Sequence, residues 1–263
     1  MSLLIVNADD FGLHPAIDEA ILQIAEAGNI TAVSVSSNGK SYNPEKVRDL
    51  SQHASIGAHI TWVGEAWLTQ PYRFESWKEL IWRSITGGKA FQKALWEEAE
   101  AQLGLLLQAG IAIDHLDSHQ HVHVFPSIWP VIQKLSKNYQ ISFIRCPWAH
   151  SPALMRSGIS GRMLHRFAKA HRENGFHFSC AGIRLAGNYS LALLEKELSI
   201  CSGQDTMLIM HPGHNNQQLN QHYGHWHFNW EQEYETLMHP DFNQLVAKYG
   251  FQLINTATAT NKA

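Results

Sequence analysis

Short apolar runs alternate along the chain with longer segments in which apolar residues recur at helical spacing. The runs expected to form strands are residues 3–8, 30–36, 55–60, 111–116, 141–146, 206–210 and 251–255. The segments expected to form helices are residues 14–27, 44–53, 74–109, 127–137, 162–172, 191–201 and 229–249. Breaks are expected near Gly87 and at Pro240, and residues 176–188 fit either structure.

This alternation of strand and helix predicts a parallel sheet, because consecutive parallel strands need a crossover that is usually a helix. With seven or eight strands, a (β/α) barrel is the natural closure, and an open doubly wound sheet is the alternative. We see no internal repeat, low-complexity segment or linker that would divide the chain. We therefore expect residues 1–263 to form a single domain.

The amino-acid composition limits the kinds of partner that this protein could bind. Of the 263 residues, 44% are apolar and 16% charged, which favours a large core over disorder. The formal charge of −3 comes without the clustered Lys and Arg that nucleic acid or an anionic membrane would require. A small molecule is the expected partner, and self-association stays open.

The cysteines and the first residues bear on the cellular compartment. Three widely spaced cysteines, Cys146, Cys180 and Cys201, offer neither a disulfide framework nor a CxxC metal pair. The first residues lack the basic segment of a signal peptide, and no stretch approaches the ~20 apolar residues of a membrane span. We expect a cytoplasmic protein.

Acidic, histidine and arginine side chains follow five of the expected strands. They are Asp9, Asp10, His59, Asp117, His119, His121, His123, Arg145 and His211. In a parallel barrel the carboxyl ends of all strands open onto one face, where active sites lie. Histidine is both a common metal ligand and a proton shuttle near neutral pH. The pattern therefore predicts a metal-dependent hydrolase with its site at this face.

The pair Asp9 and Asp10 has two interpretations. Asp-Asp-Phe-Gly could be a turn with a helix cap, since Asp and Gly favour such places. Alternatively, because adjacent side chains point in different directions, one carboxylate could bind a metal while the other acts as a general base.

The segment His119-Gln-His121-Val-His123 is more specific. If it is extended, all three histidines share a face, and if it is helical, His119 and His123 do. A solvated histidine-rich loop is the alternative. His59 is a further candidate ligand because it lies at the end of an expected apolar strand. Ligands of this kind suit Zn²⁺, or Mg²⁺ with added waters, and three protein ligands leave positions open for catalysis.

Two further groups of residues have more than one interpretation. His211-Pro-Gly-His214 contains a turn signal that could hold His211 at the sheet edge, while residues 222–227 are interpreted as a surface loop. Four tryptophans follow His59 closely, and those outside the core could form an aromatic platform for a sugar ring. Of these we take Trp62 as the candidate for substrate binding.

Four of these motifs, in order, resemble the YdjC-like carbohydrate deacetylases. They are Asn-Ala-Asp-Asp-Phe-Gly at residues 7–12, Gly-Ala-His at residues 57–59, His-Leu-Asp-Ser-His-Gln-His-Val-His at residues 115–123, and Met-His-Pro at residues 210–212. The resemblance runs from residue 3 to about residue 255. It implies a distorted (β/α) barrel and the removal of an acetyl group from N-acetylated sugars such as chitooligosaccharides, or from a related amide.

The resemblance also implies roles for individual residues. One divalent ion, Mg²⁺ or Zn²⁺, would be bound by Asp10, His59 and His119. The catalytic group would comprise Asp9 as the base, His211 as the acid and Arg145 as the residue that orients the base, with His123 lining the substrate pocket. Two rival functions are a metal-dependent phosphoesterase and a sugar-binding protein with a vestigial site. A phosphoesterase would want more carboxylates and basic residues, and the intact motif residues argue against a vestigial site.

Overall fold

The computed structural model describes residues 1–155, 158–171 and 178–260. Its strands are β1 (Ser2–Phe11), β2 (Ala32–Val35), β3 (Ser55–Ile60), β4 (His115–Ser118), β5 (Phe143–Ile144), β6 (Ser179–Ala181), β7 (Thr206–Met210) and β8 (Phe251–Leu253). Its α-helices are α1 (Pro15–Glu26), α2 (Pro44–Leu50), α3 (Trp77–Thr86), α4 (Gly88–Gln108), α5 (Trp129–Tyr139), α6 (Gly158–His171), α7 (Leu191–Cys201), α8 (Gln217–Tyr223), α9 (Trp230–Leu237), α10 (Phe242–Lys248) and α11 (Thr256–Thr260). Short 3-10 turns occur at η1 (His119–Val124), η2 (Pro152–Leu154) and η4 (Gly224–Trp226).

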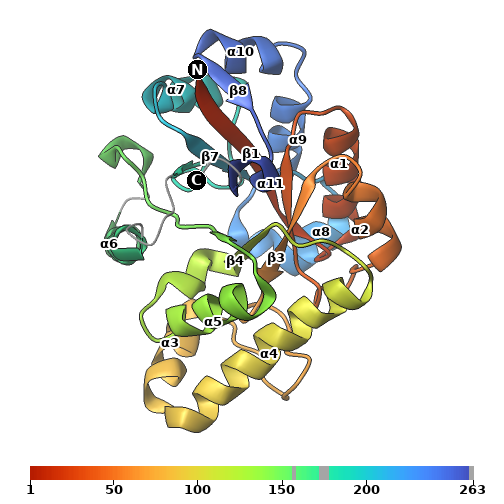
Figure 1. The fold of residues 1–263 in the computed structure, drawn as a ribbon. Helices are drawn as coiled ribbons and strands as arrows, with labels where there is room; N and C mark the ends of the chain where they lie inside the picture. Colours follow the sequence, from red (N-terminus) through yellow and green to blue (C-terminus); the bar gives the residue numbers. More distant parts are fainter. Residues whose placement is uncertain (156–157, 172–177, 261–263) are drawn as a thin grey trace.

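The strands form one parallel sheet in the order β5-β4-β3-β2-β1-β7-β6, with β8 paired to the beginning of β1. The sheet curls, and helices surround it (Figure 1). Within the described residues no strand ladder joins β5 to β6, but the Cys180 amide donates to the Trp148 carbonyl across this gap at 2.7 Å. The expected (β/α) barrel is therefore confirmed in a distorted form, and the open doubly wound alternative is not adopted.

The lengths of β4 and β5 differ from those expected. The run 111–116 was expected to be a strand, but the β3–β4 ladder begins only where His115 pairs with Gly57, and it extends to Ser118. The run 141–146 keeps a ladder only at residues 143–144. In both runs apolar residues outside the ladder, such as Ile111 and Ile141, are buried by packing instead. The apolar runs therefore predicted correctly which residues are buried, but they did not predict how long each strand is.

The curl of the sheet encloses a second, smaller core. Ile5 of β1 belongs to the same buried cluster as Phe143 of β5, although three strands separate them in the sheet. Its neighbours Leu4 and Val6 belong instead to the large cluster shared with the helices. Since side chains alternate along a strand, the inward series of β1 continues through Asn7 to residue 9. This series leads from an apolar interior to the polar end of the barrel.

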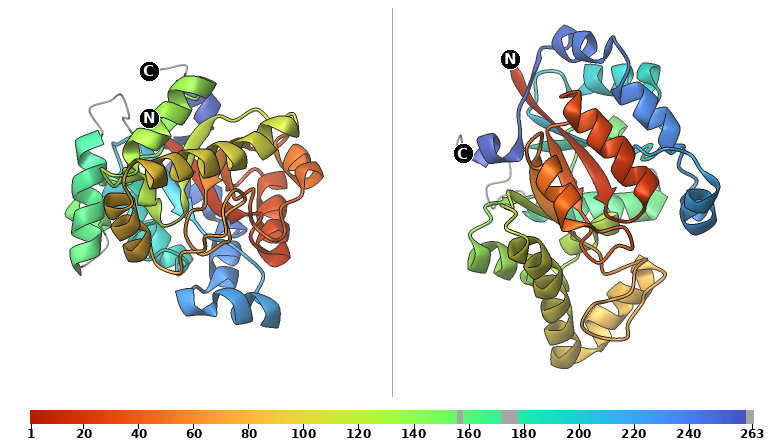
Figure 2. Two further views of the ribbon diagram at one scale, coloured as in Figure 1. Left: turned by 90° about the horizontal axis from the view of Figure 1, so that it is seen from below. Right: turned by 90° about the vertical axis from the view of Figure 1, so that its right-hand side faces the viewer.

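The two ends of the barrel differ in what covers them. Figure 2 shows α10 and the start of β1 at one end of the molecule and α3 and α4 at the other. All eight strands of the described residues run parallel, so their carboxyl ends lie together at the end that faces α3 and α8 (Figure 1). Among the described residues no helix is both long and apolar enough to cross a membrane.

Candidate active site

The backbone at the end of β1 brings two successive carboxylates to one place. Side chains of successive strand residues point to opposite faces, so Asp9 and Asp10 would ordinarily diverge. Asp10 has a left-handed φ of 73°, a conformation that costs a non-glycine residue roughly 1–3 kcal/mol. The turn that follows is held by the amide of Gly12, which donates to the buried carboxylate of Asp18 at 2.6 Å. As a result both carboxylates line the same cavity.

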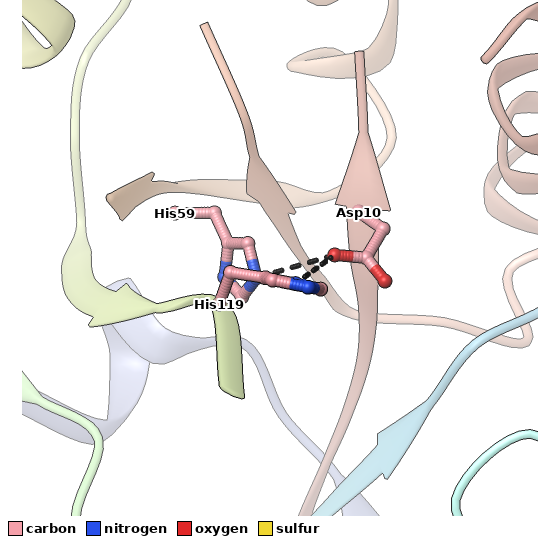
Figure 3. A group of neighbouring side chains, drawn as sticks. All are labelled: Asp10, His59 and His119. Atoms are coloured by element: carbon pink, nitrogen blue, oxygen red, sulfur yellow. Dashed lines mark hydrogen bonds and ion pairs between the residues drawn. The ribbon is translucent and has the colours of Figure 1, made fainter. Parts of the chain in front are cut away.

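Asp10, His59 and His119 converge from three different strand ends (Figure 3). The Oδ1 atom of Asp10 lies 3.3 Å from His59 Nε2 and 3.0 Å from His119 Nδ1. All three side chains are almost completely buried. Burial alone would raise the pKa of Asp10, but His119 and His59 outweigh it and hold that pKa well below its usual range. The group is therefore poised to present an ionised carboxylate beside two imidazoles.

These three residues fit a bound metal ion. Asp10 Oδ2, His59 Nε2 and His119 Nε2 are buried without a hydrogen-bond partner, which is costly unless something else satisfies them. One potential ligand atom from each residue lies within 4.8 Å of those of the other two. One carboxylate and two imidazoles form a donor set that Zn²⁺ commonly accepts. A cation bound between these three residues would satisfy polar atoms that otherwise lack a partner.

The second carboxylate, Asp9, is held by Arg145. The guanidinium Nη1 and Nη2 atoms donate to the two oxygens of Asp9 at 2.7 and 2.9 Å, and Asn7 Nδ2 donates to Oδ1 at 2.6 Å. Arg145 is also buried and lies 3.1 Å from Asp117 Oδ2. Burial alone would lower the pKa of Arg145, but Asp117 and Asp9 raise it, so the guanidinium stays charged. This bidentate pairing fixes the plane of the Asp9 carboxylate.

His211 faces the same cavity from the end of β7. Its Nε2 atom lies 3.9 Å from Asp9 Oδ2, and its ring centroid is 5.0 Å from that of Phe228. Its backbone amide donates to Glu233 at 2.6 Å, which links the end of β7 to α9. Burial lowers the pKa of His211, while the nearby carboxylates of Asp9 and Asp10 act in the opposite direction.

A cavity of about 420 Å³ opens above these residues. Asp9, Asp10, His59, His119 and His211 line its floor, and its walls include Trp77, Phe125, Leu164, Trp226 and Phe228. The ring centroid of Trp226 lies 5.0 Å from that of His119. An apolar wall beside a few convergent polar groups is the usual construction of a small-molecule site.

Two residues expected to contact substrate lie outside this cavity. Trp62 is completely buried, and its indole N–H donates to the Leu95 carbonyl of α4 at 3.2 Å. His123 is also completely buried, between the hydroxyl of Ser118 at 2.7 Å and the carbonyl of Arg145 at 2.7 Å. Both residues make internal packing contacts and hydrogen bonds, and the structure places neither of them in the lining of this cavity. His121, in contrast, does line the cavity.

The segment at residues 222–227 also differs from its interpretation as a plain surface loop. His225 and His227 are exposed, but they line the cavity together with Trp226. No periodicity in this stretch indicated that it would reach the site. Asp117 is among the strand-end residues that the sequence indicated, but no individual role was assigned to it.

Comparison with known proteins identifies the family of this chain. The model of the YdjC-like protein family matches residues 3–248, so the chain belongs to this family. A carbohydrate deacetylase of Brevibacillus brevis is 30% identical over 161 residues, which are 60% of this chain and 64% of that protein. A human carbohydrate deacetylase is 32% identical over 172 residues, which are 57% of this chain and 53% of that protein. The aligned part of the chain thus spans less than two thirds of these relatives.

A solved structure confirms the fold over nearly the full length. A protein of Enterococcus faecalis V583, described as a cellobiose-phosphate cleavage protein, has a TM-score of 0.72 at 20% identity. The similarity covers 98% of each chain. At this level of identity the comparison establishes the shared fold, and the chemistry must be argued from the site itself.

Proposed function

We propose that this protein is a metal-dependent carbohydrate deacetylase, which hydrolyses the acetamide of an N-acetylated sugar to acetate and a free amine. One observation carries the proposal: Asp10, His59 and His119, each with a buried polar atom that lacks a hydrogen-bond partner, offer ligand atoms within 4.8 Å of one another in a cavity that a second carboxylate also lines. The family relationship and the deacetylases among the relatives support the same reaction.

The balance of buried charge supports a divalent ion. Asp9, Asp10 and Asp117 are buried carboxylates, and among the described residues in contact with them Arg145 is the one permanent cation. Without a protonated histidine, two negative charges are left over, and buried charges require compensation. One divalent cation would restore neutrality while its ligands His59 and His119 bind as neutral imidazoles. Zn²⁺ suits the two nitrogen donors, and Mg²⁺, which prefers oxygen ligands, is the alternative.

The roles of the surrounding side chains follow from their positions. A divalent ion held by Asp10, His59 and His119 would supply a Lewis acid for the acetyl carbonyl and a water of lowered pKa. Asp9, oriented by Arg145, is placed to accept a proton from the attacking water. His211 lies on the same cavity floor and is placed to donate a proton to the departing amine. An ionised base and a protonated acid together predict a bell-shaped pH profile.

The walls of the cavity favour an uncharged sugar. Trp226 and Phe228 offer aromatic faces beside the polar floor, and such rings stack well on the apolar faces of sugars. Among the described lining residues there is neither a lysine nor an arginine, although phosphate sites usually contain such groups. This composition argues against the phosphoesterase alternative.

The direct test is acetate release from a panel of N-acetylated sugars of different lengths, with added Zn²⁺, added Mg²⁺ or a chelator. We expect metal-dependent release that the chelator abolishes. Absence of release with every sugar and metal, from protein that is folded, would contradict the proposal.

The Asp9→Asn variant separates an enzyme from a sugar-binding protein. The substituted amide keeps the shape of the side chain but cannot accept the proton, so turnover should be lost while metal binding persists. If the variant binds sugar as the wild type does and neither protein releases acetate, the site is a binding site only.

A further inference from the structure

One buried carboxylate, Asp117, touches both halves of the proposed site. Its Oδ1 atom is 2.6 Å from Nδ1 of the metal-ligand candidate His59, and its Oδ2 atom is 3.1 Å from Nη2 of Arg145. Ser34 also donates its hydroxyl to Oδ2 at 2.6 Å. Asp117 is completely buried and does not line the cavity, so it acts through other residues and not on the substrate.

The contact with His59 determines which imidazole nitrogen is free. An ionised carboxylate accepts hydrogen bonds and cannot donate them, so His59 must carry its proton on Nδ1 where it faces Asp117. The lone pair of the neutral ring is then on Nε2, the atom that lies 3.3 Å from Asp10 and lacks a hydrogen-bond partner. A carboxylate on the distal nitrogen of a ligating histidine fixes its tautomer and orientation.

The contact with Arg145 affects the other half of the site. Arg145 Nη2 donates to Asp9 and also faces Asp117. The guanidinium group of Arg145 therefore lies between two carboxylates, that of the proposed base Asp9 and that of Asp117. A planar, buried guanidinium with two carboxylate partners has little freedom to rotate.

We propose that Asp117 is a positioning residue that couples the metal ligand His59 to the base Asp9, through opposite oxygens of a single carboxylate. This inference rests on the proposed function, because it assumes that His59 ligates a metal. Asp117 sets the tautomer of His59 with Oδ1 and holds the Asp9–Arg145 pair in place with Oδ2.

An amide cannot replace this carboxylate. In an Asp117→Asn variant, one side of the amide accepts and the other donates. If the oxygen faces His59, the NH₂ group faces the Arg145 guanidinium, and two hydrogen-bond donors then oppose each other. If the oxygen faces Arg145, the NH₂ group faces His59 and favours the tautomer with its proton on Nε2. Either orientation disrupts one half of the site.

The test uses the full-length protein, with Zn²⁺ alone as the probe in calorimetric titrations and an N-acetylated sugar for steady-state kinetics. In Asp117→Asn we expect a 10- to 100-fold weaker Zn²⁺ affinity, the range typical for loss of such a partner. At saturating Zn²⁺ kcat should still be reduced, with KM less affected. The control is Asp114→Asn, three residues earlier, a half-buried position whose carboxylate accepts a hydrogen bond from the Ile56 amide at 3.3 Å.

The possible results separate this inference from the proposed function. Unchanged Zn²⁺ affinity and kcat in Asp117→Asn, even with a lowered Tm, would overturn the coupling role and leave the proposed function intact. A wild-type protein that binds neither Zn²⁺ nor Mg²⁺ would contradict both. Zn²⁺ binding without acetate release would contradict the proposed reaction alone, because the affinity comparison still tests Asp117.

A measurement on the wild type covers the case in which Asp117→Asn does not fold. Imidazole ¹⁵N spectroscopy of the Zn²⁺-loaded protein should show His59 with a slowly exchanging proton on Nδ1 and none on Nε2. A proton on Nε2 of His59 would overturn the inference.

Discussion

Arg145 donates to both carboxylate oxygens of Asp9, at 2.7 and 2.9 Å, where both side chains are buried. This contact joins residues that are 136 positions apart in the sequence. It places the proposed base in a defined plane beside the metal-ligand candidates.

The first prediction concerns this pair. Arg145→Lys keeps the positive charge but loses the two parallel hydrogen bonds, because an ammonium group cannot form the planar fork. We expect kcat to fall about 100-fold, the typical cost of a misplaced catalytic group, with Zn²⁺ affinity nearly unchanged. Steady-state kinetics measures kcat, and calorimetric titration measures the Zn²⁺ affinity. The control Arg48→Lys, on the exposed side of α2, should behave as the wild type, and full activity of Arg145→Lys would contradict the orienting role.

The second prediction concerns the wall of the cavity. Trp226→Ala removes the aromatic face next to His119, so we expect KM for an N-acetylated sugar to rise roughly ten-fold, equivalent to ~1.5 kcal/mol of ring contact. Trp226→Phe should recover part of the loss. Trp82→Ala, which removes a tryptophan that is 69% exposed on α3, is the control. An unchanged KM in Trp226→Ala would show that the sugar does not use this wall.

The third prediction concerns Asp18, which holds the turn after the two site carboxylates. Burial raises its pKa from 3.8 to about 6, against the opposing effects of Ser41, Gly12 and Lys46. The folded state therefore binds this proton more tightly than the unfolded state, and the free energy of unfolding falls as pH rises from about 4 through about 6. The loss is up to roughly 3 kcal/mol.

Asp18→Asn tests this pH dependence, because an amide can keep both hydrogen bonds if Ser41 turns to accept. Urea denaturation of both proteins across this pH range should show the wild type losing stability relative to the variant. A stability difference that does not change with pH would refute the raised pKa of Asp18.

Much of the fold could be predicted from the sequence because it depends on local patterns. Strand β7 and helix α7 have the expected bounds, since an apolar run and a helical repeat each fix their own element. The barrel follows from their alternation. The limits of β4 could not be predicted, because they depend on where the neighbouring strand β3 offers a partner.

The site could be predicted only where it lies at strand ends. Asp10, His59 and His119 come together because parallel strands deliver their carboxyl ends to one face. The left-handed φ of Asp10 has no sequence signal beyond the Asp-Phe-Gly context. Trp226 reaches the cavity through packing of a distant segment, and Trp62 turns into the core to pack against α4. Where these two side chains pack depends on tertiary contacts, which the spacing of residues along the chain does not indicate.

Anomalous diffraction from crystals grown with Zn²⁺ tests whether Asp10, His59 and His119 bind a metal ion. We expect one strong anomalous peak within coordination distance of these three residues, and its loss in a His119→Ala variant that remains folded. A peak at another set of ligands, or no peak at this site at a saturating Zn²⁺ concentration, would show that these residues do not form the Zn²⁺ site.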